Sequence, residues 1–179
     1  MKRAIHGQQV SVTGASTLAG RLIRTFGTPI IATPPLNHLF PTPEVLAVAD
    51  IVRIGLPKKR AETIRAFAKA VTEGRVAFSS VANVEDFQTR LRELPGIGDW
   101  TAQYIAMRAL GDPDAFPASD LGLLRASSLG NQLELAERAE AWRPWRAYAA
   151  MYLWQGRVEL HLKDRSSKRV SALARSATV

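Results

Sequence analysis

The sequence predicts an all-α protein. Apolar residues recur at three- and four-residue spacing along almost the whole chain of 179 residues, whereas strict apolar–polar alternation is nearly absent. No internal repeat or low-complexity segment interrupts this pattern. A chain of this length can bury a hydrophobic core without a metal or a disulfide. We therefore expect amphipathic helices packed around such a core.

Helices are expected in the first half at residues 4–26, from residue 43, at 57–74 and at 83–93. The first could be two helices, because "TGA" at 13–15 is a potential kink. Thr42 can cap the second helix, and Pro43 suits its first position, where no backbone N–H is needed. Pro57 lies near the start of the third, which Gly74 ends, since glycine readily adopts the left-handed conformation that closes a helix. Asn83 can cap the fourth.

In the second half, helices are expected at residues 99–110, 121–129, 132–141 and 144–155. Gly111 ends the first of these, and the proline-containing loop "DPDAFPAS" follows it. We therefore expect two helical lobes, at about 1–112 and 113–160, with a cleft between them as the natural place for a site. Residues 161–179 form a basic tail with little apolar surface to bury, which we expect to be mobile or a loosely held helix.

The charge balance favours an anionic partner such as nucleic acid. There are 24 Lys and Arg against 16 Asp and Glu, a formal net charge of +8, and the last 20 residues contribute about half of it. The absence of cysteine excludes disulfides, cysteine-ligated zinc, iron–sulfur clusters and thiol nucleophiles. The three histidines are far apart in the sequence, so we expect no transition metal. No long apolar run or secretion signal is present, which predicts a cytoplasmic protein without a membrane partner, and we expect a monomer.

The segment "LPGIGDWTAQYIAMRALG", at 94–111, contains an unusually tight turn before a helix. Gly96 and Gly98 can adopt positive φ, and exposed N–H groups at the start of the following helix would form a concave array of donors. The helix dipole adds partial positive charge there, so the turn can bind a phosphate. The alternative is a tight helix–helix corner with a glycine cap, and the letters "PGIG" alone do not decide between the two.

Five segments together resemble a known family. "LPGIGDWTAQYIAMRALG" resembles the hairpin of the helix-hairpin-helix-GPD DNA glycosylases, and "DAFPASDLGLLRA" resembles the segment that carries their catalytic aspartate. "AIHGQQVSV", "LFPTPEVLA" and "WRPWRAYAAMYLW" resemble the DNA-3-methyladenine glycosylase II branch. The segments occur in the family's order from about Ala4 to Trp154. The resemblance implies a two-lobed helical enzyme that excises alkylated bases from double-stranded DNA in base excision repair.

The resemblance places the catalytic carboxylate at Asp120. Hydrolysis of an N-glycosidic bond passes through an oxocarbenium-like sugar, which needs a carboxylate to stabilise charge or activate water. The alternative role for Asp120 is the cap of the helix that begins at Leu121, with Ser119 as a competing cap, and both roles can hold together. Lyase branches of the family carry a nucleophilic lysine at the position of Trp100, so the resemblance implies a monofunctional hydrolase.

Three aromatic residues, Trp100, Tyr104 and Trp154, match the positions that line the base pocket in the glycosylase II branch. Electron-rich rings attract a cationic base, and N-alkylation makes a purine cationic and a better leaving group. The alternative for each ring is ordinary core packing, which we favour for Trp142 and Trp145. Which alkylated purine is preferred stays open.

The resemblance also implies residues that contact the DNA backbone and a side chain that fills the space left by a flipped base. Gln9 is the wedge that fills this space, unless Gln8 and Gln9 are simply the polar face of a helix. Gly96 and Gly98 donate backbone N–H groups to a phosphate, and Thr101 adds a side-chain contact. No cofactor is implied except a sodium or potassium ion at the carbonyls of Arg92, Leu94 and Ile97. The run 58–60, "KKR", is a solvated helix start that could reach DNA.

The chain departs from the glycosylase II branch at its beginning. That branch has a β-rich N-terminal domain before the matching segments, and we expect this chain to lack it. A helix-hairpin-helix module that grips DNA without turnover is therefore the main alternative, and a helical interaction protein with a basic tail is another. Asp120 and the pocket aromatics favour the enzyme, because a phosphate-gripping module needs none of them.

Overall fold

The computed structural model describes residues 12–31, 37–79 and 81–156, and the regular structure within these ranges is helical. The one β pairing there is a single bridge between Pro29 and His38. The all-α prediction is thus confirmed. The chain divides into two compact units, Met1–Gly111 and Asp112–Val179, which we call unit 1 and unit 2. A cleft between lobes stays a prediction.

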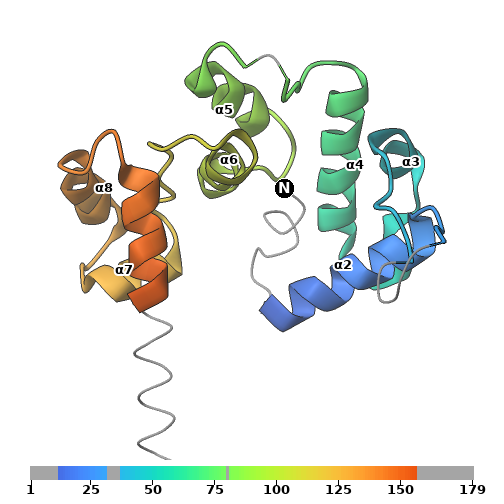
Figure 1. The fold of residues 1–179 in the computed structure, drawn as a ribbon, viewed down its shortest axis with the longest axis horizontal. Coiled ribbons are helices and arrows are strands. Elements are labelled where there is room, and N and C mark those ends of the chain that lie inside the picture. Colours follow the sequence, from blue (N-terminus) through green and yellow to red (C-terminus); the bar gives the residue numbers. More distant parts are fainter. Residues whose placement is uncertain (1–11, 32–36, 80, 157–179) are drawn as a thin grey trace, which may run out of the picture. The chain divides into compact units, whose positions relative to one another are not determined.

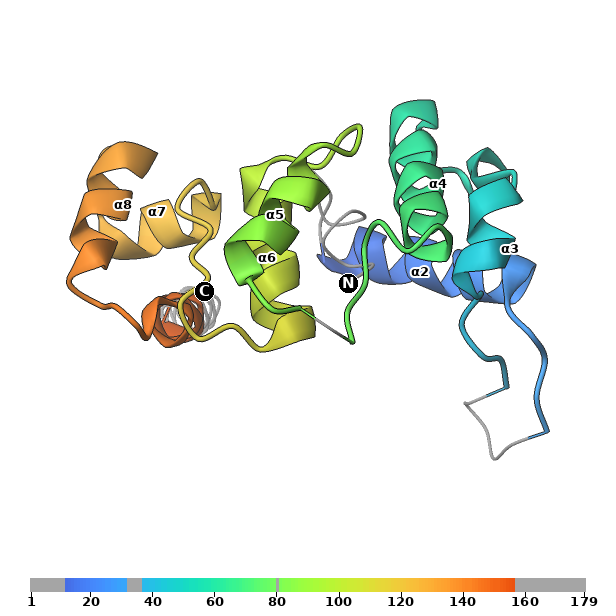
Figure 2. The ribbon, with the colours of Figure 1, turned by 90° about the horizontal axis from the view of Figure 1, so that it is seen from above.

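The helices of unit 1 begin and end close to the predicted positions. In its described part these are α2 (Val12–Phe26), α3 (Pro43–Val48), the 3-10 turn η1 (Ile51–Ile54), α4 (Lys58–Thr72), α5 (Val84–Arg92), α6 (Asp99–Ile105) and the π-helical turn η2 (Ala106–Leu110). Helix α3 packs along α4, α5 packs on α6, and α2 lies against η1 (Figure 1). Figure 2 shows α5 and α6 side by side from above. The "TGA" sequence lies inside α2, and the earlier part of the predicted first helix lies outside the described residues.

Local side-chain and backbone contacts explain where these helices begin and end. Asn83 caps α5 by accepting hydrogen bonds from the N–H groups of Glu85 and Asp86, as predicted. Gly74 follows α4 with a φ of +72°, as expected for the glycine that ends a helix. Thr42 precedes α3 without capping its backbone. Its hydroxyl instead bonds the Glu44 carboxylate, which lowers the pKa of that carboxyl below its ordinary value.

The core of unit 1 joins its elements through large apolar side chains. Leu22 of α2, Ile51 of η1, Leu91 of α5 and Ile105 of α6 are all essentially inaccessible to solvent. Burial of such side chains from several elements stabilises their packing by about 1.5–3 kcal/mol per side chain. Within the described ranges, no helix is both long and apolar enough to cross a bilayer.

The turn at residues 93–98, which we call the hairpin turn, is shaped by close packing against α4. Gly96 has a φ of +78°, and a Cβ placed on it would lie 2.2 Å from Thr63 Oγ1. Thr63 is buried, and its hydroxyl donates to the Lys59 carbonyl one turn earlier, so it cannot easily move away. Glycine at position 96 is therefore required by the fold itself.

Reciprocal hydrogen bonds between the side-chain amides of Gln88 and Gln103 join α5 to α6 on either side of the hairpin turn.

Unit 2 contains three helical segments in its described part: α7 (Leu121–Ser127), α8 (Gln132–Glu140) and residues 146–156. Asn131 caps α8 by accepting from the N–H groups of Leu133 and Glu134. Ser128, which follows α7, has a φ of +58°, so a non-glycine residue adopts the left-handed conformation at that helix end. The buried side chains of Leu123 and Leu135 bring apolar faces of α7 and α8 into the core.

An ion-pair cluster anchors the loop at 112–119. Arg146 makes a two-pronged contact with Asp114, with Nε 2.8 Å from Oδ1 and Nη2 2.9 Å from Oδ2. Its Nη1 lies 2.8 Å from Glu140 Oε1, and Arg143 pairs with both Asp114 and Glu140. Arg146 and Asp114 are only 16% and 21% exposed, and the Ala147 N–H also donates to the Pro113 carbonyl. This cluster ties the loop to α8 and to the helix at 146–156.

Replacing Gly96 with alanine should destabilise unit 1. Alanine would have to adopt positive φ and displace Thr63, so we expect Gly96→Ala to lower the free energy of unfolding by about 2–4 kcal/mol. Urea unfolding measures this loss. Gly98→Ala is the matched control: Gly98 has a φ of −91° and open space around the added Cβ, so its loss should stay below about 1 kcal/mol. A Thr63→Ala background should reduce the Gly96→Ala loss; equal losses in both backgrounds would contradict the packing account.

The charge cluster predicts a stability change in acid. The hydrogen bond from Arg143 lowers the pKa of the Glu140 carboxyl below its ordinary value of 4.5. A carboxyl with a lowered folded-state pKa stabilises the fold above its unfolded-state pKa, and this contribution is lost as pH falls through the folded-state pKa. The urea midpoint of Glu140→Gln should thus fall less steeply than that of the wild type below about pH 5. Glu137→Gln, which changes an exposed carboxylate of the same helix outside the cluster, should keep the wild-type slope; parallel slopes for all three proteins would contradict this account.

Candidate functional site

The hairpin turn presents backbone donors to solvent. Gly96 and Gly98 are both exposed, and the described residues provide no hydrogen-bond acceptor for either N–H group. We expected both glycines to be capable of positive φ, but only Gly96 uses it; Gly98 is extended, with φ −91° and ψ 179°. A Cβ on Gly98 would meet nothing within 4 Å. The fold therefore imposes no steric requirement for glycine at position 98, which is the N-cap of α6, a position where glycine is among the favoured residues.

The charge at the start of α6 is balanced within the hairpin. Asp99 is the first residue of α6, where its carboxylate would oppose an approaching anion. Arg92, at the end of α5, pairs with it at 3.0 Å between Nη1 and Oδ1. The guanidinium also donates to Thr89 Oγ1, so two contacts orient it. The pair offsets the Asp99 charge beside the exposed N–H groups.

The predicted cation ligands come from the same turn. The carbonyls of Arg92, Leu94 and Ile97 are neutral oxygen donors, a set that suits a hard cation of low charge. The Leu94 carbonyl accepts from the Ile97 N–H at 3.1 Å, which occupies one of its two lone pairs. The donor set thus fits a sodium or potassium ion, and this site stays a prediction.

The remaining predicted DNA contacts have different outcomes. Thr101 is 0% exposed, so the predicted contact of its side chain with a phosphate is wrong: the residue belongs to the buried face of α6. Gln9 lies outside the described residues. In the run 58–60, Lys58 and Lys59 are exposed at the start of α4, and no ion pair within the described ranges neutralises them.

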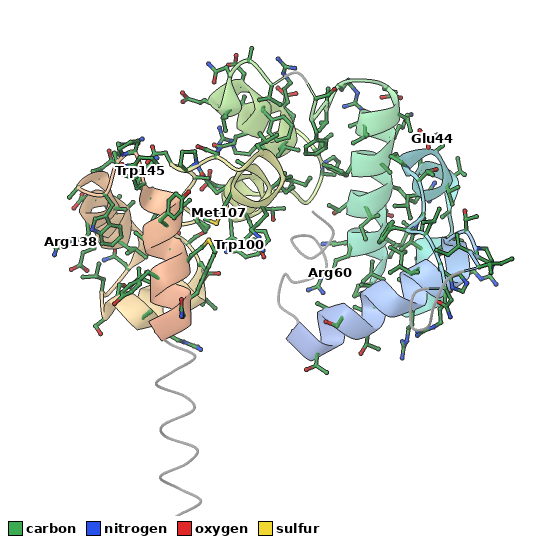
Figure 3. All side chains as sticks on the ribbon, in the orientation of Figure 1. Glu44, Arg60, Trp100, Met107, Arg138 and Trp145 are labelled. Atoms are coloured by element: carbon green, nitrogen blue, oxygen red, sulfur yellow. The ribbon has the colours of Figure 1, made fainter. Side chains whose placement is uncertain are left out.

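Two of the predicted pocket aromatics form a pair on α6. The rings of Trp100 and Tyr104 are stacked, with centroids 5.2 Å apart and planes inclined by 10°. Their spacing of four residues places them on one helix face. Figure 3 shows Trp100 projecting from α6 on the side away from α5. Both rings are half-buried and pack against the core of unit 1, so the packing alternative also holds for part of each ring.

The third predicted aromatic meets the predicted catalytic carboxylate in unit 2. Asp120 is the N-cap of α7 and its Oδ1 accepts from the Leu123 N–H at 2.9 Å, so the capping role is confirmed. The indole Nε1 of Trp154 donates to the same Oδ1, also at 2.9 Å. Both side chains are half-buried. The structure thus brings Asp120 and Trp154 together, although 34 residues separate them in the sequence.

The two other tryptophans of unit 2 differ from each other. Trp142 is half-buried and contacts Phe116 edge-to-face, with ring centroids 5.9 Å apart, in agreement with the favoured packing role. Trp145 is 58% exposed and touches the ring of Tyr148, so core packing is wrong for this residue (Figure 3). Its position, just before the helix at 146–156, places it at the surface.

Sequence reasoning missed three features around the candidate site. The Trp154–Asp120 hydrogen bond and the Asp114–Arg146 pair join residues more than 30 positions apart, and no local pattern signals them. The third feature is the π-helical turn η2, which ends at Gly111 with a φ of +70°. Only Gly111 could be read from the sequence, as the end of a helix.

The chain is similar in sequence to known DNA repair proteins. The chain is 44% identical over 157 residues to the Mycobacterium tuberculosis protein named "Probable bifunctional transcriptional activator/DNA repair enzyme AlkA", covering 85% of this chain and 32% of that protein. It is 36% identical over 155 residues to DNA-3-methyladenine glycosylase 2 of Escherichia coli, covering 85% and 55%. The chain therefore spans between about a third and just over half of the length of these curated relatives.

Solved structures show the same fold. The 3-methyladenine DNA glycosylase Mag1 of fission yeast, in complex with abasic DNA, matches with a TM-score of 0.72 and 25% identity over 86% of this chain and 76% of that one. The 3-methyladenine DNA glycosylase of Archaeoglobus fulgidus matches with a TM-score of 0.74 and 28% identity over 86% and 56%. The family model of the HhH-GPD superfamily base excision DNA repair proteins matches residues 3–146, which contain the hairpin turn and Asp120. The chain belongs to the HhH-GPD superfamily.

Proposed function

We propose that this protein is a base-excision DNA glycosylase that hydrolyses the N-glycosidic bond of alkylated purines, of the 3-methyladenine type, and leaves an abasic site. The observation that carries the proposal is the Asp120 carboxylate, which two N–H donors hold in place beside an aromatic ring. The name of the Escherichia coli relative, DNA-3-methyladenine glycosylase 2, supports the same substrate class, and the name of the Mycobacterium tuberculosis relative supports a role in DNA repair.

In this proposal the hairpin turn binds the phosphate backbone of the DNA. The exposed N–H groups of Gly96 and Gly98 donate to a phosphate oxygen, and the start of α6 adds the positive end of its dipole. Glycine at position 98 lets the phosphodiester approach the backbone. A cation held by the hairpin carbonyls would add positive charge beside that phosphate. The Mag1 complex with abasic DNA supports DNA as the partner.

Aromatic rings select the base in this proposal. A base in the duplex must leave the stack before its glycosidic bond is accessible. Trp100 and Tyr104 in unit 1 and Trp154 in unit 2 each offer an aromatic face on which a flipped base can stack, and the ring quadrupoles favour a base that carries a positive charge. N-alkylated purines carry such a charge and leave more readily, so binding and reactivity favour the same substrates.

Hydrolysis then requires stabilisation of the sugar cation. As the C1′–N bond breaks, its electron pair leaves with the purine and positive charge develops on the deoxyribose. The Asp120 carboxylate lies opposite this charge, stabilises it and orients a water molecule that attacks C1′. The attacking water passes a proton to the Asp120 carboxylate, which releases it to solvent, and the water oxygen becomes the hydroxyl of the abasic sugar while the cationic purine leaves as a neutral base. Trp100 has no amine that could form a Schiff base, so the strand is not cleaved.

The direct test is release of methylated purines from alkylated duplex DNA by the wild type and by Asp120→Asn. Asparagine keeps an acceptor for the Leu123 N–H, so the cap of α7 and the fold should survive. Loss of the negative charge should lower the single-turnover rate by about 100-fold or more, since electrostatic stabilisation of the transition state is removed. DNA affinity, measured at the same fixed salt concentration, should change little.

The outcomes separate the enzyme from a DNA-binding module. Release by the wild type together with an Asp120→Asn rate within a factor of about two would contradict the catalytic role of Asp120. Tight binding of DNA by a folded wild type without any release would instead indicate a helix-hairpin-helix module that grips phosphates without turnover. The wild-type products should contain abasic sites and no strand breaks before alkali treatment.

A further inference from the structure

Two hydrogen bonds converge on one oxygen of the predicted catalytic carboxylate. Leu123 N–H and Trp154 Nε1–H each lie 2.9 Å from Asp120 Oδ1. The first bond is an ordinary helix cap, which serves α7. The second comes from a different helix and has no part in capping. It therefore needs an explanation of its own.

The indole bond is not needed to attach the helix at 146–156 to unit 2. That helix is already held by Arg146, which contacts both carboxylate oxygens of Asp114, and by the bond from Ala147 N–H to the Pro113 carbonyl. Ala147 and Ala150 are also buried against the core. These contacts lie at the beginning of the helix, and Trp154 lies about two turns further on.

The second donor does have a clear effect on the carboxylate. A carboxylate held by one N–H can still turn about its Cβ–Cγ bond, because that torsion is soft. Two donors that reach the same oxygen from different elements remove this freedom. The two donors also fix the direction in which Oδ1 points, and therefore the orientation of the carboxylate plane.

We propose that Trp154 is a positioning residue for Asp120: its indole N–H holds the carboxylate in the orientation that catalysis needs. The proposal rests on the proposed glycosylase function and adds a second role to a residue assigned there to base stacking. One indole then touches the base with its face and the carboxylate with its edge. Seating of a base against the ring and orientation of the carboxylate are coupled through this single side chain.

The test separates the ring of Trp154 from its N–H group. One variant is Trp154→Phe; the sharper one replaces Trp154 with benzothienylalanine, in which sulfur takes the place of the N–H and the bicyclic ring is kept. With enzyme in excess over alkylated duplex, we expect the maximal single-turnover rate to fall by about 10-fold or more in the isostere, because small misplacements of a reacting group are costly. The half-saturating enzyme concentration should stay within a factor of about three, since the stacking surface is kept.

Two controls make the result specific. Trp145→Phe changes an exposed tryptophan of the same unit that does not touch Asp120, and it should keep the wild-type rate. In an Asp120→Asn background, loss of the Trp154 N–H should cause little further decrease, since its effect passes through the carboxylate. A change in the fold alone would lower the rate in both backgrounds, and urea midpoints of all variants report on that change.

Equal maximal rates for the wild type and the isostere would overturn the positioning role while leaving the proposed function intact. Equal rate losses in the wild-type and Asp120→Asn backgrounds would overturn it as well, because the N–H would then act independently of the carboxylate. Absence of purine release by the wild type would overturn both proposals together.

Discussion

The geometry of the proposed catalytic site in unit 2 depends on Asp120 Oδ1 as a shared acceptor. A capping aspartate normally serves one helix, but here the same oxygen also accepts the indole N–H of Trp154. The start of α7 and the helix at 146–156 are thus joined at the residue to which the chemistry is assigned. The Asp114 cluster holds the preceding loop, and buried Ala115, Phe116 and Pro117 lead the chain from it to Asp120. Asp120 is therefore constrained both by the chain that leads to it and by a contact across the unit.

The hairpin turn in unit 1 assigns different roles to its two glycines. Gly96 is glycine because α4 lies against it and because its φ is positive. Gly98 is under no such steric constraint, because the space around it is open, and its N–H group is exposed. The fold thus fixes Gly96 as glycine, whereas the proposed phosphate contact uses the exposed N–H groups of both residues.

Local signals in the sequence predicted most of the fold. Asn83, Gly74 and Gly111 mark helix ends where the structure has them, because caps and left-handed glycines act over a few residues. The resemblance of short motifs placed Asp120, and the structure added that it caps α7. The burial of Thr101 and the exposure of Trp145 were not predicted, because residue type alone does not reveal which helix face packs inward. The bond between Trp154 and Asp120 depends on tertiary structure and could not be predicted from spacing.

The proposed function requires a DNA phosphate at the hairpin turn and a sugar beside the Asp120 carboxylate, and this requirement is its central claim. A crystal structure of the wild type bound to duplex DNA with a non-hydrolysable abasic-site analogue tests it most directly. The account predicts a phosphate oxygen within hydrogen-bonding distance of the Gly98 N–H and the analogue's sugar beside the Asp120 carboxylate, with the Trp154 bond to Oδ1 intact. DNA bound away from the hairpin turn, or a sugar far from Asp120, would contradict it.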